Sequence, residues 1–185
     1  MKALPEKFAE RMKVLLGDEY ESYVASLNKV PVRAFRVNTD KISFSDFEKI
    51  NPFNTEKIPY VENGFYFTDE KIGNHPYHHA GMIYVQEPGA MAPAECVDIE
   101  PDWFVLDMCA APGGKSFGCA ITMENCGTVR SFDIHENKLS LIRSGAERLG
   151  IDIITAAVGD GKNPAEELWG TGDFVICDAP CSGLG

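Results

Sequence analysis

No two cysteines of this sequence stand at Cys-x-x-Cys spacing, and no apolar run approaches the roughly 18 residues that a membrane span requires. Residues 1–13 have no apolar core like that of an export signal, so we expect no secretory signal and no membrane partner. Without such a signal, the six cysteines are interpreted as reduced thiols of a cytoplasmic protein. With 44% hydrophobic and 24% charged residues, the composition is that of a globular protein and excludes a disordered one.

Positive charge is also scarce. Seventeen Lys and Arg stand against 28 Asp and Glu, and the net charge of −11 argues against a nonspecific polyanion binder. Only the stretch 1–40 is not acidic. Within it, Arg33 and Arg36 are our candidates for contact with nucleic-acid phosphates, and a solvated surface is the plainer alternative.

The pattern of elements changes near residue 100. The first part predicts a small α+β region, with helices over 5–17, 19–27, 43–50 and 88–96, and strands over 32–38, 57–61 and 64–67. The second part alternates helices with apolar strands over 103–107, 128–133, 151–158 and 173–178. Gly150 ends the helix over 135–149, and a short helix is expected over 163–168. This alternation predicts an α/β fold with a Rossmann-like parallel sheet, covered on both faces and incomplete at four strands.

The loop after the first of these strands, residues 107–116 (DMCAAPGGKS), is rich in small residues. Such a loop at the carboxyl end of a strand lets a ligand approach the backbone and the next helix N-terminus. A phosphate-binding P-loop would need glycine where Cys109 stands, and Gly113-Gly114 does not fit the dinucleotide fingerprint. The remaining interpretations are an S-adenosylmethionine site, whose methionine moiety lies along such a turn, and a purely structural turn.

Acids stand at the ends of the first three strands of this second part. Asp133 is placed to accept hydrogen bonds from two ribose hydroxyls, Asp160 to meet an adenine amino group, and Asp107 to balance a ligand ammonium. Each acid alone is equally compatible with capping the helix that follows. Together they favour an adenosyl-containing cofactor.

The fourth strand leads into residues 177–183 (CDAPCSG), which place an acid and a thiol in one Pro-Gly turn. Carbon 5 of a pyrimidine becomes nucleophilic when a thiolate adds to carbon 6, and an acid bonded to ring nitrogen 3 assists. Asp178 and Cys181 are therefore candidate catalytic residues for cytosine C5 methylation. A buried, inert thiol is the alternative for Cys181, and it is what we expect of Cys177 in the strand core.

With these two loops the sequence resembles the Sun/Nop-type family of RNA cytosine-5 methyltransferases. The matching segments are 107–115 (DMCAAPGGK) and 178–183 (DAPCSG). Upstream, segments 35–39 (FRVNT) and 79–87 (HAGMIYVQE) look like the N-terminal region of the bacterial ribosomal-RNA members, most of all the 16S rRNA methyltransferase F group.

The resemblance implies methylation of carbon 5 of a cytosine in ribosomal RNA, with S-adenosylmethionine as cofactor and Asp178 also holding the cytosine ring. Residues 1–100 would then be an accessory, RNA-contacting region, and residues 101–185 the N-terminal part of the catalytic domain. Besides Asp107, placed by its strand end, the implied cofactor-binding residues are Cys109, Ala110, Ala111, Pro112, Gly113, Gly114, Lys115, Asp133, Asp160 and Asp178.

In that family the loop cysteine, here Cys181, assists product release, and the attacking nucleophile lies in a later Thr-Cys motif. These 185 residues contain no Thr-Cys pair, so we expect a truncated enzyme that binds cofactor weakly and does not turn over. In DNA cytosine methyltransferases a Pro-Cys cysteine attacks, and that role stays open for Cys181. Their loop usually has Gln where Ser182 stands, which favours the RNA family.

Two other classes stay open, namely a noncatalytic RNA-binding or cofactor-binding module and a small-molecule methyltransferase. The histidines at 75, 78 and 79 have no Cys or acid at ligand spacing, so we expect them to pack in a Pro-bearing turn, and we expect no metal. The stripe Phe65-Tyr66-Phe67 is interpreted as strand packing rather than a base-stacking platform. We expect RNA as the partner and a monomer.

Overall fold

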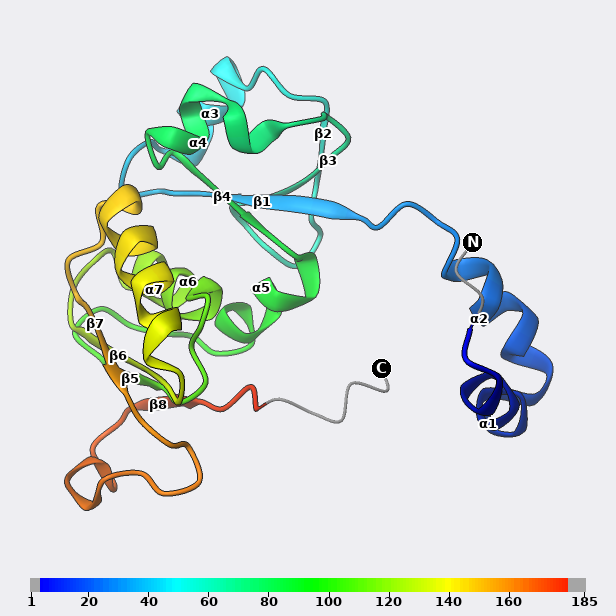
Figure 1. The fold of residues 1–185 in the computed structure, drawn as a ribbon. Helices are drawn as coiled ribbons and strands as arrows, with labels where there is room; N and C mark the ends of the chain where they lie inside the picture. Colours follow the sequence, from blue (N-terminus) through cyan, green and yellow to red (C-terminus); the bar gives the residue numbers. More distant parts are fainter. Residues whose placement is uncertain (1–3, 180–185) are drawn as a thin grey trace. The chain divides into compact units, whose positions relative to one another are not determined.

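The computed structural model describes residues 4–179, which divide after Val32 into two compact units (Figure 1). The first unit holds α1 (Glu6–Leu16), a 3-10 helix (Gly17–Glu19) and α2 (Tyr20–Ser26). Both α-helices confirm the prediction, and α1 ends at Gly17, which has a φ of 52°. No helix within residues 4–179 is long and apolar enough to cross a bilayer.

The second unit begins with an antiparallel sheet in the order β2-β3-β1-β4. Its strands are β1 (Arg33–Val37), β2 (Thr55–Lys57), β3 (Gly64–Phe67) and β4 (Ile83–Gln86). The central strand β1 pairs with β3 on one side, with Arg36 opposite Gly64, and with β4 on the other, with Arg36 opposite Tyr84. This sheet and its helices confirm the predicted α+β region.

The two faces of this sheet have separate cores because side chains alternate along β1. One face packs against α3 (Phe44–Ile50) through a cluster of rings: Phe35, Phe47, Phe65 and Phe67. On the opposite face, Ala34 packs with Met91 of α5 (Pro88–Glu95). Two rings of the aromatic stripe in β3 therefore fill the core, which confirms strand packing.

Two strands of this sheet differ from the prediction. β2 ends at Lys57, because Pro59 has no amide hydrogen and residues 58–61 form a turn, in which Val61 N donates to Ile58 O at 3.3 Å. β4 was not predicted, since four residues between Gly81 and Pro88 are too few to give a clear periodicity.

The His-rich segment forms α4 (Pro76–His79) after a 3-10 helix (Ile72–Asn74). His75 caps α4, because its Nδ1 accepts a hydrogen bond from Tyr77 N at 3.2 Å, and its ring lies 4.7 Å from that of Phe53. The described part of the chain contains no cluster of three His, Cys, Asp or Glu that could hold a metal. The segment packs as a Pro-bearing turn, as predicted.

A parallel sheet follows, in the order β7-β6-β5-β8. Its strands are β5 (Phe104–Asp107), β6 (Thr128–Asp133), β7 (Ile154–Val158) and β8 (Phe174–Ile176). Counted within this sheet, the order is the 3-2-1-4 of doubly wound folds, which bind ligands where the strand order reverses, here between β5 and β8. The predicted Rossmann-like α/β fold is confirmed.

Two helices, α6 (Gly114–Thr122) and α7 (Glu136–Leu149), lie between the parallel and the antiparallel sheet (Figure 1). Gly150 ends α7 with a φ of 72°, as predicted, and Ile151 N still donates to Ala146 O, so β7 begins later than expected. On the other face, Leu168 of a 3-10 helix (Glu166–Leu168) packs with Leu106. This single turn replaces the helix predicted over 163–168.

The two sheets of the second unit are joined through buried polar contacts. Asn38 Nδ2 donates to Gly81 O at 3.0 Å and to Leu149 O at 2.8 Å. Arg148, at the end of α7, donates to His78 O at 2.6 Å. The predicted domain boundary near residue 100 lies in the connection between α5 and β5.

Arg36 is part of this buried framework. Its side chain is 2% exposed, and its NH1 donates to Glu95 Oε1 at 2.7 Å and to Asn63 Oδ1 at 2.9 Å. The predicted contact of Arg36 with a phosphate is therefore corrected, because its guanidinium is buried and bonds within the fold. Arg33 is exposed and stacks over the Phe67 ring at 5.0 Å, and its phosphate contact stays a prediction.

Candidate active site

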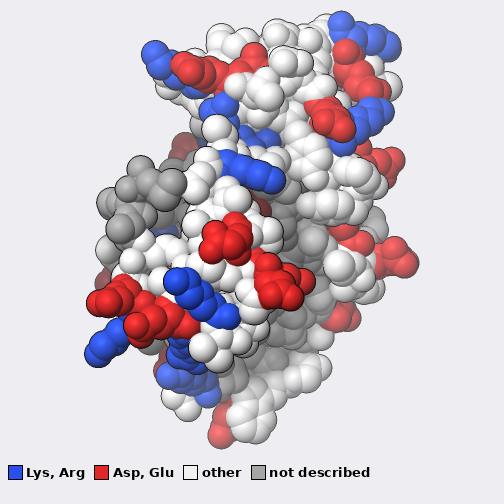
Figure 2. All heavy atoms as spheres, turned by 90° about the vertical axis from the view of Figure 1, so that its right-hand side faces the viewer, with Lys and Arg blue, Asp and Glu red and all other residues white. Residues whose placement is uncertain are grey.

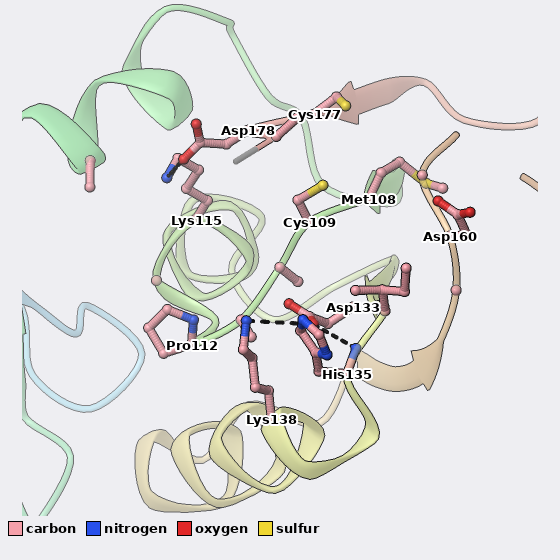
Figure 3. A pocket seen from close by; sticks show the side chains of 18 of the residues that line it. Met108, Cys109, Pro112, Lys115, Asp133, His135, Lys138, Asp160, Cys177 and Asp178 are labelled. Carbon is pink, nitrogen blue, oxygen red and sulfur yellow. Dashed lines mark hydrogen bonds and ion pairs between the residues drawn. The ribbon is translucent and has the colours of Figure 1, made fainter. Parts of the chain in front are cut away.

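A cavity of about 880 Å³ opens at the carboxyl ends of the parallel strands (Figure 3). This volume is typical of a site for a small organic ligand. Its walls come from the end of β4 with the first turn of α5, the loop after β5, the β6–α7 turn, the loop after β7 and the residues after β8. The loop after β5 and the residues after β8 meet here because their strands are neighbours at the switch point.

The glycine loop after β5 bends tightly into α6. Gly113 has a φ of 110°, and a Cβ there would lie 2.5 Å from Phe117 Cζ, so only glycine fits. A Cβ on Gly114 would lie 3.2 Å from the Tyr84 hydroxyl and from Gln86 Nε2. Of the predicted loop residues, Gly113 does not line the cavity, and those that do are Cys109, Ala110, Ala111, Pro112, Gly114 and Lys115.

Asp107 lies behind this loop and outside the cavity wall. It is 1% exposed, and its carboxylate accepts hydrogen bonds from Ser116 Oγ at 2.8 Å and from Cys109 N at 3.3 Å. Burial raises the pKa of this carboxyl, although both hydrogen bonds act in the opposite direction. The predicted contact of Asp107 with a ligand ammonium is therefore corrected: its side chain holds the loop against the strand.

The other two strand-end acids line the cavity. Asp133 Oδ1 accepts a hydrogen bond from His135 N at 2.9 Å and lies 3.9 Å from Lys138 Nζ (Figure 3). Its Oδ2 has no hydrogen-bond partner among residues 4–179, so this oxygen is available to a ligand. Asp160 fixes its own turn, because its Oδ1 accepts a hydrogen bond from Lys162 N at 3.0 Å.

Lys115 and Asp178 connect the two loops that the sequence singled out. Lys115 Nζ lies 2.6 Å from Asp178 Oδ2, and the Asp178 side chain is 62% exposed, so the pair is open to a ligand (Figure 3). Ala179 also lines the cavity. Cys181, the other candidate catalytic residue, lies outside the described residues.

Two thiols line the cavity beside this ion pair. β8 ends at Ile176, so Cys177 lies beyond the strand and is exposed; its predicted burial in the strand core is wrong. Cys109 is half-buried, and burial, together with neighbouring Cys177, raises the pKa of its thiol. Neither thiol belongs to the hydrophobic core.

The antiparallel sheet contributes one wall of the cavity, which was not predicted from the sequence. Tyr84 and Gln86 occupy alternate positions of β4, and both line the cavity. Glu87 also lines it and caps α5, with its Oε2 accepting a hydrogen bond from Ala90 N at 2.9 Å. The alternation Tyr84-x-Gln86 places both side chains on one face of a strand, and it becomes informative once β4 is recognised as one.

The residues of the cavity fit an adenosyl amino acid. Asp133 at the end of the second parallel strand offers a free oxygen to ribose hydroxyls. The first turn of α6 favours a carboxylate, because its amide hydrogens have no acceptor within the helix and are free to bind one. The small residues of the loop between them, Ala110 and Ala111, allow close approach to the backbone.

This fold and this site define the class of the protein, which is that of the S-adenosylmethionine-dependent methyltransferases. A crystal structure of a methyltransferase homologue from Pyrococcus horikoshii has a TM-score of 0.85 at 34% identity, and the match covers 98% of this chain and 61% of that one. NSun6 from the same organism, solved with SFG, shares the fold with a TM-score of 0.81 at 20% identity, over 96% of this chain and 71% of that one.

The chain belongs to the RsmB/F family of 16S rRNA methyltransferases. Residues 4–88 match the N-terminal domain of 16S rRNA methyltransferase RsmF, and residues 94–185 match 16S rRNA methyltransferase RsmB/F. This confirms the expected family, whose cofactor is S-adenosylmethionine.

Two curated relatives show how much of such a protein this chain represents. It is 31% identical to probable ribosomal RNA small subunit methyltransferase B of Bacillus subtilis and 31% identical to ribosomal RNA small subunit methyltransferase F of Aeromonas salmonicida. Each match covers 98% of this chain but only 42% and 41% of those proteins, respectively. The chain therefore spans about two fifths of the length of these relatives.

Proposed function

We propose that this chain is the cofactor-binding part of an enzyme that methylates carbon 5 of a cytosine in small-subunit ribosomal RNA. One observation carries the proposal: the glycine loop and the residues after β8 open into a single cavity, joined there by the Lys115–Asp178 pair. A donor bound along the first loop and a base held by the second would share that space. A small-molecule methyltransferase gives no reason for the Asp178-Ala-Pro-Cys sequence.

Bound S-adenosylmethionine supplies an electrophilic methyl group. In this proposal Asp133 binds the ribose hydroxyls, Asp160 the adenine end and the loop 109–115 the amino-acid end. Asp178, in its protonated carboxylic acid form, donates a proton to ring nitrogen 3, which makes carbon 6 a better target for a thiolate. Lys115, 2.6 Å from Asp178, keeps that side chain oriented toward the cavity.

Cys181 has a separate role in the proposal. By the family resemblance it assists release of the methylated base, while the attacking thiol belongs to a Thr-Cys pair that the 185 residues do not contain. The 185-residue chain by itself is therefore proposed to bind cofactor without turning over.

Few basic side chains are available to contact the proposed RNA partner, because the chain has 17 Lys and Arg against 28 Asp and Glu. On the face shown in Figure 2, Lys and Arg are interspersed with Asp and Glu rather than gathered in one patch. We propose that Arg33, exposed at the start of β1, contacts an RNA phosphate, and that the protein works in the cytoplasm as a monomer. A noncatalytic binding module is the alternative, and it predicts no methyl transfer in any form of the protein.

The test joins residues 1–185 to the remaining C-terminal part of the Bacillus subtilis relative and supplies labelled S-adenosylmethionine and small-subunit ribosomal RNA. Digestion to nucleosides and mass spectrometry are expected to show 5-methylcytidine with the chimera and none with the 185-residue chain. Another methylated nucleoside would contradict the proposed cytosine C5 specificity. Normal turnover by the 185-residue chain would contradict its proposed inactivity.

The same chimera separates the two possible roles of Cys181. In the Cys181→Ala variant, a release role predicts that a covalent RNA–protein adduct accumulates and is seen as a shifted band on a denaturing gel. Loss of every adduct would instead assign the attack on carbon 6 to Cys181. Cys126→Ala is the matched control, because Cys126 is exposed and does not line the cavity.

A further inference from the structure

A buried acceptor without a donor lies in the wall of the cavity. Gln86 lines the cavity and is 7% exposed, and its Oε1 is buried with no hydrogen-bond partner among the described residues. A buried amide oxygen left unpaired costs free energy, so such an atom is usually paired with a ligand, an ordered water or an ion.

The orientation of this amide is fixed by its other end. Gln86 Nε2 donates to Ala90 O at 3.0 Å in the first turn of α5. A flipped amide would place two oxygens against each other, so the assignment of Oε1 and Nε2 follows from chemistry. The acceptor of Gln86 therefore stays unpaired on the side away from Ala90.

Tyr84 presents a second polar group at the same place. A Cβ on Gly114 would lie 3.2 Å from the Tyr84 hydroxyl and 3.2 Å from Gln86 Nε2, so both side chains flank the start of α6. The Tyr84 ring is fixed by an edge-on contact with Phe117 at 5.2 Å between centroids. Burial raises the pKa of the phenol, so the hydroxyl stays protonated and is available as a donor.

An acceptor and a donor beside a helix N-terminus match a zwitterion. The first-turn amides of α6 and the Tyr84 hydroxyl suit a carboxylate, and Gln86 Oε1 suits an ammonium. Asp107, the acid expected to balance the ammonium, is outside the cavity wall. The antiparallel sheet thus adds an uncharged acceptor and an uncharged donor beside the loop, whose own charged side chain at the cavity is Lys115.

We propose that Tyr84 and Gln86 bind the amino-acid end of the cofactor, with the Gln86 Oε1 atom accepting a hydrogen bond from its ammonium and the Tyr84 hydroxyl donating to its carboxylate. The inference rests on the proposed function, since it takes S-adenosylmethionine as the ligand. It assigns the antiparallel sheet a direct part in cofactor binding.

The experiment measures the equilibrium binding of two ligands to the 185-residue chain by isothermal titration calorimetry. S-adenosylhomocysteine carries the amino-acid end, and 5′-methylthioadenosine lacks it. Gln86→Met is expected to lower the affinity for S-adenosylhomocysteine about tenfold, as the loss of one hydrogen bond to a charged group predicts. The affinity for 5′-methylthioadenosine is expected to stay within about twofold of its original value. Tyr84→Phe, which keeps the ring against Phe117, is expected to act in the same direction with a smaller loss.

The matched control is Tyr77→Phe, which removes a hydroxyl from a ring packed in the Phe35 cluster and outside the cavity wall. This variant is expected to bind both ligands with unchanged affinity. Equal losses for both ligands in Gln86→Met and Tyr84→Phe would overturn the inference, because they would mean that the side chains only shape the cavity. Unchanged binding of both ligands would overturn it as well. If the unaltered chain binds neither ligand, the proposed function fails together with the inference.

Discussion

The antiparallel and the parallel sheet each have four strands, yet their buried side chains differ in kind. The antiparallel sheet packs against α3 through phenylalanines, with ring centroids of Phe35 and Phe65 at 5.6 Å. The parallel sheet packs against α6 and α7 chiefly through aliphatic residues: Val105, Val129, Leu139, Ile142 and Leu149. Each aromatic ring buries a large area, so strands of three to five residues are enough to hold the first sheet together.

The two sheets also place their charges differently. In the antiparallel sheet, Arg36 is buried and paired with Glu95. In the parallel sheet, Asp133 at a strand end and Asp178 just beyond one face the cavity. The cause is topological, because parallel strands all end at one edge, where their final polar residues converge, whereas antiparallel strands end at alternate edges. The first sheet thus uses Arg36 for its own structure, whereas the second, apart from the buried Asp107, presents acids to the cavity.

The largest expected effect tests the buried charge. In Arg36→Met, Glu95 and Asn63 lose the donor that both share, so the free energy of unfolding is expected to fall by about 2–3 kcal/mol. The matched control in the other sheet is Arg130→Met, since the exposed guanidinium of Arg130 only stacks over the Phe104 ring at 5.4 Å. The free energy of unfolding is expected to fall by about 0.5 kcal/mol in this variant. Urea unfolding followed by circular dichroism measures both.

If the free energy of unfolding fell equally in the two arginine variants, buried charge would not distinguish the antiparallel from the parallel sheet. A loss in Arg36→Met that disappears when Glu95 is also changed to Gln would sharpen the distinction, since the cost would then come from the unpaired carboxylate.

A smaller effect is expected for a charge that faces the cavity. In Asp133→Asn the oxygen that accepts from His135 N is kept, but the carboxylate charge is lost, so affinity for S-adenosylhomocysteine is expected to fall about tenfold. Asp133 is 7% exposed, but the substitution keeps the shape of the side chain and the oxygen that accepts from His135 N, so the unfolding free energy is expected to fall by less than about 1 kcal/mol. Asp152→Asn, on an exposed acid away from the cavity, is the control, and calorimetry gives both affinities.

If Asp133→Asn lowered stability as much as Arg36→Met does, Asp133 would be a structural acid like those buried elsewhere in the fold. An unchanged affinity would instead remove Asp133 from the proposed binding site.

The parallel half of the fold could be predicted from its sequence because local signals agree there. Each strand is a short apolar run bounded by turn residues, and Gly150 marks the end of α7 by adopting a left-handed conformation. The antiparallel half gave weaker signals. β4 has four residues between Gly81 and Pro88, and its pairing with β1 is set by contacts distant in sequence.

The site was predictable to the extent that it lies in loops of unusual composition. The glycine loop and the segment around Asp178 were located from residue types alone, and the structure brings them together at the Lys115–Asp178 pair. Burial was not predictable, because it depends on what packs against a residue. Arg36 is therefore buried where exposure was expected, and Cys177 exposed where burial was expected. Tyr84 and Gln86 were not predicted as site residues because their strand, β4, was not predicted.

The smallest expected effect compares thiols of the core and of the cavity. Burial raises the pKa of Cys119 to about 12, so at pH 8 its reactive thiolate is nearly absent in the folded protein, whereas Cys177 is exposed. With iodoacetamide at pH 8, peptide mass spectrometry is expected to find Cys177 alkylated first and Cys119 only after urea is added. S-adenosylhomocysteine is expected to slow alkylation of Cys177, which lines the cavity, and not of exposed Cys126, which does not. Rapid alkylation of Cys119 without urea would mean that the core around α6 opens readily, and the parallel sheet would then be the less stable of the two.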